Sequence, residues 1–132
     1  MSRSLYTKIV LLIIFTAFLA NNNSSAQDEK VYKTATVMPS YPGGKDALAK
    51  FLKANVKYPT AASTAKITGT VTISFIIEKT GGLTNLDVAN SIGYGCDEEG
   101  LRVVRKMPKW NPGTIAGKPV RVAYKVLIKF PQ

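Results

Sequence analysis

The side chains that most often perform catalysis or hold metals are scarce in this chain. Its 132 residues include no histidine and a single cysteine, Cys96. Histidine is the usual general base and metal ligand, and one cysteine alone forms neither a zinc site nor an intrachain disulfide. The composition therefore argues against an enzyme, and we expect no catalytic residue, no metal and no cofactor.

Three consecutive carboxylates, Asp97-Glu98-Glu99, are the remaining candidates for acid–base chemistry. They begin a predicted helix whose second half carries Arg102, Arg105 and Lys106. Acidic groups near a helix N-terminus and basic groups near its C-terminus each stabilise the helix by roughly 0.3–1 kcal/mol. This order of charges favours helix stabilisation over catalysis.

Cys96 and Trp110 each admit a structural and a functional interpretation. A free cysteine is usually buried, but Cys96 stands beside the start of the predicted helix, where a reactive thiolate is stabilised. Trp110 lies between Pro108 and Pro112 and fits core packing, although tryptophan is also enriched at binding hot spots. The sequence favours burial of both side chains and leaves the functional interpretations open.

Period-two hydrophobic patterns predict three strands. Residues 70–78 and 83–90 are joined by a glycine turn at residues 79–82, which is typical of a hairpin. The last strand ends at Phe130. One face of it carries Val120, Val122, Tyr124, Val126, Ile128 and Phe130, and the other carries Arg121, Ala123, Lys125, Leu127 and Lys129.

Two amphipathic segments predict helices, over residues 45–56 and 97–107. The first ends before Tyr58-Pro59, because the residue before a proline avoids the helical region. Gly100 lies inside the second, which should cost about 0.5–1 kcal/mol. The order helix, strand, strand, helix, strand predicts an α+β fold, with two helices packed on a three-stranded antiparallel sheet.

The first 26 residues have the composition of a secretory signal peptide. Arg3 and Lys8 precede a nearly continuous apolar run, residues 9–20. Ser24-Ser25-Ala26 after this run is a small-residue cleavage site. An uncleaved membrane anchor is the alternative, although a span needs about 20 apolar residues.

The net charge and the expected export together limit the classes of binding partner. Without residues 1–26 the chain would have 106 residues with 16 basic and 8 acidic side chains, a net charge of +8. Such a charge is typical of nucleic-acid binders, but export argues against nucleic acid and favours acidic surfaces of the envelope. We expect a polar tail over residues 27–38 and a single domain over residues 39–132.

Four motifs together resemble the C-terminal domain of TonB-type energy transducers, in the form common in Bacteroidetes. They are Tyr41-Pro42-Gly43-Gly44, Lys57-Tyr58-Pro59, the stretch SIGYGCDEEGLRVVRKMPKWNPG from Ser91 to Gly113, and Gly117-Lys118-Pro119-Val120. The resemblance covers residues 38–130. It implies the α+β architecture above and a protein-binding module rather than an enzyme.

The resemblance also implies a partner and a binding strand. Family members are periplasmic domains that bind the TonB box, a short N-terminal peptide of outer-membrane TonB-dependent receptors, for energy-dependent uptake of siderophores, cobalamin or glycans. The peptide adds as a strand beside the last strand of the domain. By position, the contact residues would be Val120, Arg121, Val122, Ala123, Tyr124, Lys125, Val126, Leu127, Ile128 and Lys129.

The chain departs from the family pattern before the domain. A full transducer carries an inner-membrane helix and a long linker, whereas the segment from Asn23 to Pro39 would reach only some 50 Å at about 3.3–3.6 Å per residue. Cleavage would leave a free periplasmic domain, retention would favour the inner-membrane ExbB/ExbD motor as a partner, and a homodimer stays open. The alternative function is that of a basic envelope protein that binds acidic polymers without transducing energy, with binding that falls steeply with salt.

Overall fold

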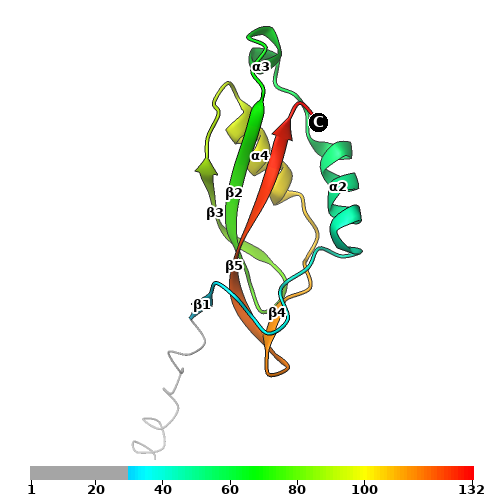
Figure 1. Cartoon of the computed structure of the whole chain (residues 1–132), viewed down its shortest axis with the longest axis vertical. Coiled ribbons are helices and arrows are strands. Elements are labelled where there is room, and N and C mark those ends of the chain that lie inside the picture. Colours follow the sequence, from blue (N-terminus) through cyan, green and yellow to red (C-terminus); the bar gives the residue numbers. More distant parts are fainter. Residues whose placement is uncertain (1–29) are drawn as a thin grey trace, which may run out of the picture. The chain divides into compact units, whose positions relative to one another are not determined.

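The structure is a computed structural model that describes residues 30–132 (Figure 1). The expected signal peptide or anchor, residues 1–26, lies outside the described residues. Residues Val31–Gln132 form a compact unit. None of the helices in residues 30–132 has the length and apolarity that a membrane span requires.

Residues 30–132 form an α+β fold built on one curled sheet (Figure 1). The strands along the sheet follow the order β1-β5-β2-β3, and β4 pairs with β5. The strands are β1 Val31–Tyr32, β2 Gly69–Ile77, β3 Leu83–Asn90, β4 Gly113–Ile115 and β5 Lys118–Phe130. The helices are α2 Gly44–Asn55, α3 Thr60–Thr64 and α4 Cys96–Arg105.

The predicted architecture of two helices on a three-stranded antiparallel sheet was right in class but incomplete. The central strands β5, β2 and β3 are antiparallel as expected, but β1 runs parallel to β5, so the sheet is mixed. Strand β4 and helix α3 are further additions. Within the expected polar tail, residues 31–37 are strand-like in sequence, and β1 forms at the start of that segment. Strand β4 and helix α3 have three and five residues, too short to carry a periodic signal.

The predicted core face of the sheet is confirmed. Strand β3 has the expected bounds, and β2 begins and ends one residue earlier than expected. The inward side chains of the two central strands are fully or nearly fully buried: Val71, Ile73, Phe75, Ile77, Val122, Val126, Ile128 and Phe130. Tyr124 and Val120 share this face but are half-buried.

Gly100 permits a close approach between α4 and β2. A Cβ atom at this position would lie 3.2 Å from Ile73 Cδ1 and 3.4 Å from Val71 Cγ1. The residue is buried at the helix–sheet contact. The backbone cost expected for a helical glycine is therefore accompanied by tighter packing.

The hairpin turn between β2 and β3 positions Trp110. Gly81 has a φ of 87°, and its carbonyl oxygen accepts a hydrogen bond from the Trp110 backbone N–H at 2.9 Å. A Cβ atom on Gly81 would lie 2.0 Å from the Trp110 carbonyl oxygen. Only glycine fits here, and the contact anchors the segment that leads into β4.

Candidate peptide-binding edge

Strand β5 has one edge covered by β2 and a second edge that is only partly covered. Pairing with β2 is continuous, from Gly69 with Phe130 to Ile77 with Val122. Val122 also pairs with Tyr32, so β1 lies on the opposite edge from β2. Within residues 30–132, no strand pairs with this outer edge beyond Val122. The outer edge therefore offers backbone N–H and C=O groups to another chain.

The ten residues predicted for peptide contact fall into two groups. Val120 pairs with Gly113 of β4, and β1 pairs with Arg121 and Val122. The remaining positions, 123–129, carry the uncovered outer edge. Their contact with a peptide stays a prediction.

The side chain of Arg121 is engaged within the domain. Its Nε and Nη2 donate to Glu78 Oε2 and Oε1 at 2.7 and 3.0 Å, and Thr84 Oγ1 donates to Glu78 Oε1 at 2.6 Å. The hydrogen bond from Arg121 is the main reason that the pKa of Glu78 lies below its ordinary value, with Thr84 adding to it against the opposing effect of burial. Arg121 therefore serves as a tie between β5 and the end of β2.

The two faces of β5 differ in character beyond Val122. On the open face, Lys125 and Lys129 are exposed, and Leu127 is 64% exposed between them. On the core face, the half-buried Tyr124 ring packs edge-on against Trp110 with a centroid distance of 5.2 Å. An added strand would thus meet polar and apolar surroundings at alternate positions.

The opposite edge of the sheet, strand β3, is a less regular template. Its pairing with β2 shifts register between Thr72 and Ile73 and again between Ser74 and Ile76. Asn85 adopts a φ of 51° in this strand, as asparagine tolerates in the left-handed region. Bulges disrupt the ladder and bend the strand, so the continuous β5 offers the better edge for strand addition.

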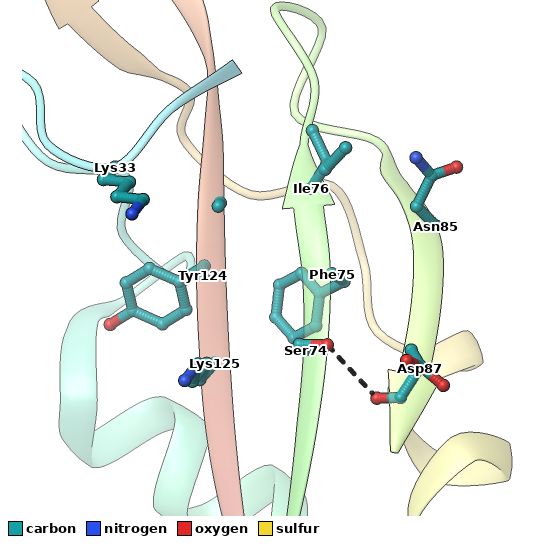
Figure 2. Close-up of a pocket in the computed structure, with 9 residues that line it drawn as sticks. Lys33, Ser74, Phe75, Ile76, Asn85, Asp87, Tyr124 and Lys125 are labelled. Carbon is teal, nitrogen blue, oxygen red and sulfur yellow. Dashed lines mark hydrogen bonds between the residues drawn. The ribbon is translucent and has the colours of Figure 1, made fainter. Parts of the chain in front are cut away.

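A groove of about 680 Å³ crosses the open face of the sheet (Figure 2). Ser74 and Ile76 of β2 line its floor, and Lys33 and Lys125 stand at its β5 side. Asp87 lies across the groove on β3, where its backbone oxygen accepts a long hydrogen bond of 3.5 Å from Ser74 Oγ. The groove is cationic on the side of the uncovered edge.

The acidic triplet serves the start of α4. Asp97 Oδ1 accepts backbone N–H bonds from Ile92 and Gly93 at 3.0 and 3.4 Å, and its other oxygen accepts from Ser91 Oγ. Burial raises the pKa of Asp97, but these hydrogen bonds outweigh it and the net pKa is lowered. These contacts support the interpretation that the acidic residues stabilise the helix start rather than take part in catalysis. Among the described residues, no cluster of acidic and sulfur ligands could hold a metal.

Glu99 connects α4 to the end of α2. Its Oε2 accepts from the Lys57 backbone N–H at 2.6 Å and from Arg102 Nη2 at 2.8 Å. Arg102 Nη2 also donates to the Asn55 carbonyl oxygen at 2.8 Å. The hydrogen bond from Arg102 is the largest cause of the lowered pKa of Glu99. The contact Lys57–Glu99 was not foreseen, because no sequence period links positions 42 residues apart.

Cys96 and Trp110 both belong to the core. Cys96 is fully buried, and burial is the main cause of its raised pKa, with the neighbouring carboxylates adding to it. Trp110 is 3% exposed and packs edge-on against Tyr41 and Phe75. The expected burial of both side chains is confirmed.

Comparison with known proteins identifies a family for this chain. The family model described as Gram-negative bacterial TonB protein C-terminal matches residues 54–131, from the end of α2 to beyond β5. No curated protein and no solved structure matches the chain. The matched region includes the uncovered edge of β5, the lining of the open-face groove apart from Lys33, and the acidic start of α4.

Proposed function

Because the chain belongs to the TonB C-terminal domain family, a family of non-catalytic energy transducers, we propose that it binds the TonB-box peptide of outer-membrane TonB-dependent receptors in the periplasm. Binding occurs by strand addition at the outer edge of β5, over residues 123–129. The process it serves is energy-dependent uptake of a siderophore, cobalamin or a glycan.

The observation that carries this proposal is the asymmetry between the two edges of the sheet. Strand β5 pairs with β2 without interruption from Phe130 to Val122. Among the described residues, β4 and β1 pair with β5 only up to Val122, so the other edge of residues 123–129 has no partner strand. A regularly paired strand with an open edge is the template that strand addition requires. Backbone hydrogen bonds would give affinity with tolerance to the peptide sequence.

Alternately N-methylated peptides test the proposal without changing the protein. Short synthetic N-terminal peptides of outer-membrane receptors would be titrated into the purified full chain, and a binding peptide would then be N-methylated on either of its two alternating sets of residues. In a strand that pairs on one side, only one set directs its N–H groups at β5. We expect one methylation pattern to abolish binding and the other to leave it nearly unchanged.

Hydrogen exchange identifies the edge that is used. Peptide binding should protect alternate amides within residues 123–129, whereas protection confined to β3 would overturn the proposal. Equal tolerance of both methylation patterns would overturn it too. Binding that disappears steeply with salt and is matched by unstructured acidic polymers would instead favour the basic envelope protein.

A further inference from the structure

The groove on the open face of the sheet carries opposite charges at its two sides. Lys125 on β5 and Asp87 on β3 are both in register with Ser74 of β2, so the three residues form one row across the sheet. Residues directly opposite each other on paired strands project from the same face, and Figure 2 shows Lys125 and Asp87 on either side of Ser74. The row therefore presents an ammonium group, a hydroxyl group and a carboxylate in that order.

The charged ends of this row are not neutralised within the domain. Among residues 30–132, neither Lys125 nor Lys33, which lines the same side of the groove, forms an ion pair, and no basic side chain pairs with Asp87. Asp87 Oδ1 accepts a hydrogen bond from the Val88 N–H at 2.9 Å. Two strand spacings of about 4.7–4.9 Å separate the Cα atoms of Lys125 and Asp87 by about 9–10 Å. A short molecule with an anion at one end and a cation at the other spans this interval.

Apolar surface accompanies the charged row. Ile76 and Ala123 are partners across β2 and β5, and both line the groove beside the row. Leu127 lies two residues beyond Lys125 on the same face and is 64% exposed. The groove volume of about 680 Å³ falls within the roughly 300–1,000 Å³ of small-molecule sites. A ligand that matches this surface carries apolar groups next to its two charges.

The chemistry around Asp87 favours a primary ammonium group over a quaternary one. A primary ammonium donates hydrogen bonds, which the Asp87 carboxylate and the Ser74 hydroxyl oxygen accept. Quaternary ammonium groups are instead recognised by the faces of several aromatic rings. The aromatic residues that line the groove are Phe75, which is 2% exposed, and Tyr124, which is half-buried against Trp110. These two rings do not form such a cage.

We propose that the open face of the sheet binds the phosphoethanolamine headgroup of a membrane lipid. The phosphate pairs with Lys33 and Lys125, the ammonium group pairs with Asp87 above Ser74, and the start of the acyl chains contacts the apolar flank. A lipid fits better than a free solute, because the lipid joins apolar groups to its zwitterion. The site lies on the face of β5 and not on its edge, so this inference is independent of strand addition.

Soluble headgroups test the zwitterion site. Glycerophosphoethanolamine and glycerophosphocholine would be titrated into the purified full chain and followed by amide chemical shifts. Both are uncharged overall and differ only in the methylation of the nitrogen. We expect the ethanolamine compound to bind about fivefold more tightly, in line with one exposed charge-assisted contact, with shifts centred on Ser74, Asp87 and Lys125. Equal binding, or shifts centred elsewhere, would overturn the proposal.

Substitutions separate the two ends of the site. Asp87→Asn should abolish the preference for ethanolamine over choline, whereas Asp46→Asn, the same change at an exposed position of α2, should keep it. Lys125→Gln should weaken binding of both compounds, because both carry the phosphate, and Lys50→Gln on α2 should weaken neither. Loss of the preference in both aspartate variants would show a general effect of charge and overturn the role of Asp87.

Vesicles test the lipid as the ligand. The full chain would be sedimented with phosphatidylcholine vesicles and with vesicles in which part of this lipid is replaced by phosphatidylethanolamine. Neither surface has a net charge, so the positive charge of the chain favours neither, and attachment through the apolar residues 9–20 would be common to both. Binding that rises with phosphatidylethanolamine and loses this rise in Asp87→Asn supports the proposal. Binding of the soluble headgroup without any preference among the vesicles would overturn the lipid as the ligand.

Discussion

Arg121 on β5 and Glu78 at the end of β2 form a two-pronged ion pair, with Nε to Oε2 at 2.7 Å and Nη2 to Oε1 at 3.0 Å. Their side chains are 22% and 23% exposed. The pair lies where β2 turns away into the hairpin and where β1 meets β5. It therefore fixes the end of β5 from which the uncovered edge begins.

Loss of this ion pair should lower stability in a pH-dependent manner. Glu78→Gln should reduce the free energy of unfolding near neutral pH by about 1 kcal/mol, since the pair is partly exposed. The folded-state pKa of Glu78 lies below its ordinary value of 4.5. The carboxylate thus stabilises the fold above that value, and this contribution is lost as the pH falls through the folded-state pKa. Urea unfolding at a series of pH values measures it.

Arg121→Lys provides the control for Glu78→Gln. It keeps the positive charge but loses the two-pronged geometry, so its stability should lie between those of the wild type and Glu78→Gln. A stability difference between wild type and Glu78→Gln that stays constant down to strong acid would contradict a role for the ionised carboxylate.

Gly100 and Ile73 should show energetic coupling. At an unobstructed helical position, glycine to alanine gains roughly 0.5–1 kcal/mol, but here the new Cβ would lie 3.2 Å from Ile73 Cδ1 and 3.3 Å from its Cγ1. Gly100→Ala alone should therefore gain less than that range. Ile73→Val removes Cδ1 but keeps Cγ1, so in that background part of the gain should be recovered. A double-mutant cycle by urea unfolding should give a coupling energy of at least ~0.5 kcal/mol, and additive effects would contradict the close contact.

The predictable part of the fold is the part with long periodic patterns. Alternation along β2 and β5 identified their buried faces, and the glycine turn at residues 79–82 identified the hairpin. Helix α3 was missed because Pro59 was interpreted only as the end of the preceding helix, whereas it also precedes the first turn of α3. The fixed φ of proline suits a helix start, whereas its clash with the preceding residue ends a helix before it.

The candidate site was predictable only along β5 itself. The strand and its two faces follow from the alternation of apolar and polar residues along β5. The pairing of Val31 with Arg121 joins segments 90 positions apart, and no local pattern encodes it. The same holds for Lys33 and Tyr41, which reach Tyr124 only through the fold. Short elements in the N-terminal part are stabilised by tertiary contacts rather than by their own propensity.

The thiol of Cys96 should be unreactive toward thiol reagents in the folded protein. Its side chain is fully buried, and burial raises its pKa, as do the carboxylates of Asp97, Glu98 and Glu99. Both effects lower the fraction of reactive thiolate. An aromatic disulfide reagent should label the native chain at least ~100-fold more slowly than the urea-unfolded chain, because labelling requires opening of the core. Rapid native labelling would contradict the burial of Cys96.

Lys125 and Lys129 should keep the uncovered edge of β5 from pairing with a second copy of the chain. Edge strands avoid self-association by carrying charge, especially lysine, and the neighbouring Leu127 is 64% exposed. Lys125→Ala/Lys129→Ala should therefore self-associate at concentrations where the wild type is monomeric, as measured by sedimentation velocity. Lys50→Ala/Lys53→Ala loses the same charge on exposed positions of α2 and should not. If the wild type already forms dimers through β5, amide protection in residues 123–129 will rise with concentration, and the lysines do not protect the edge.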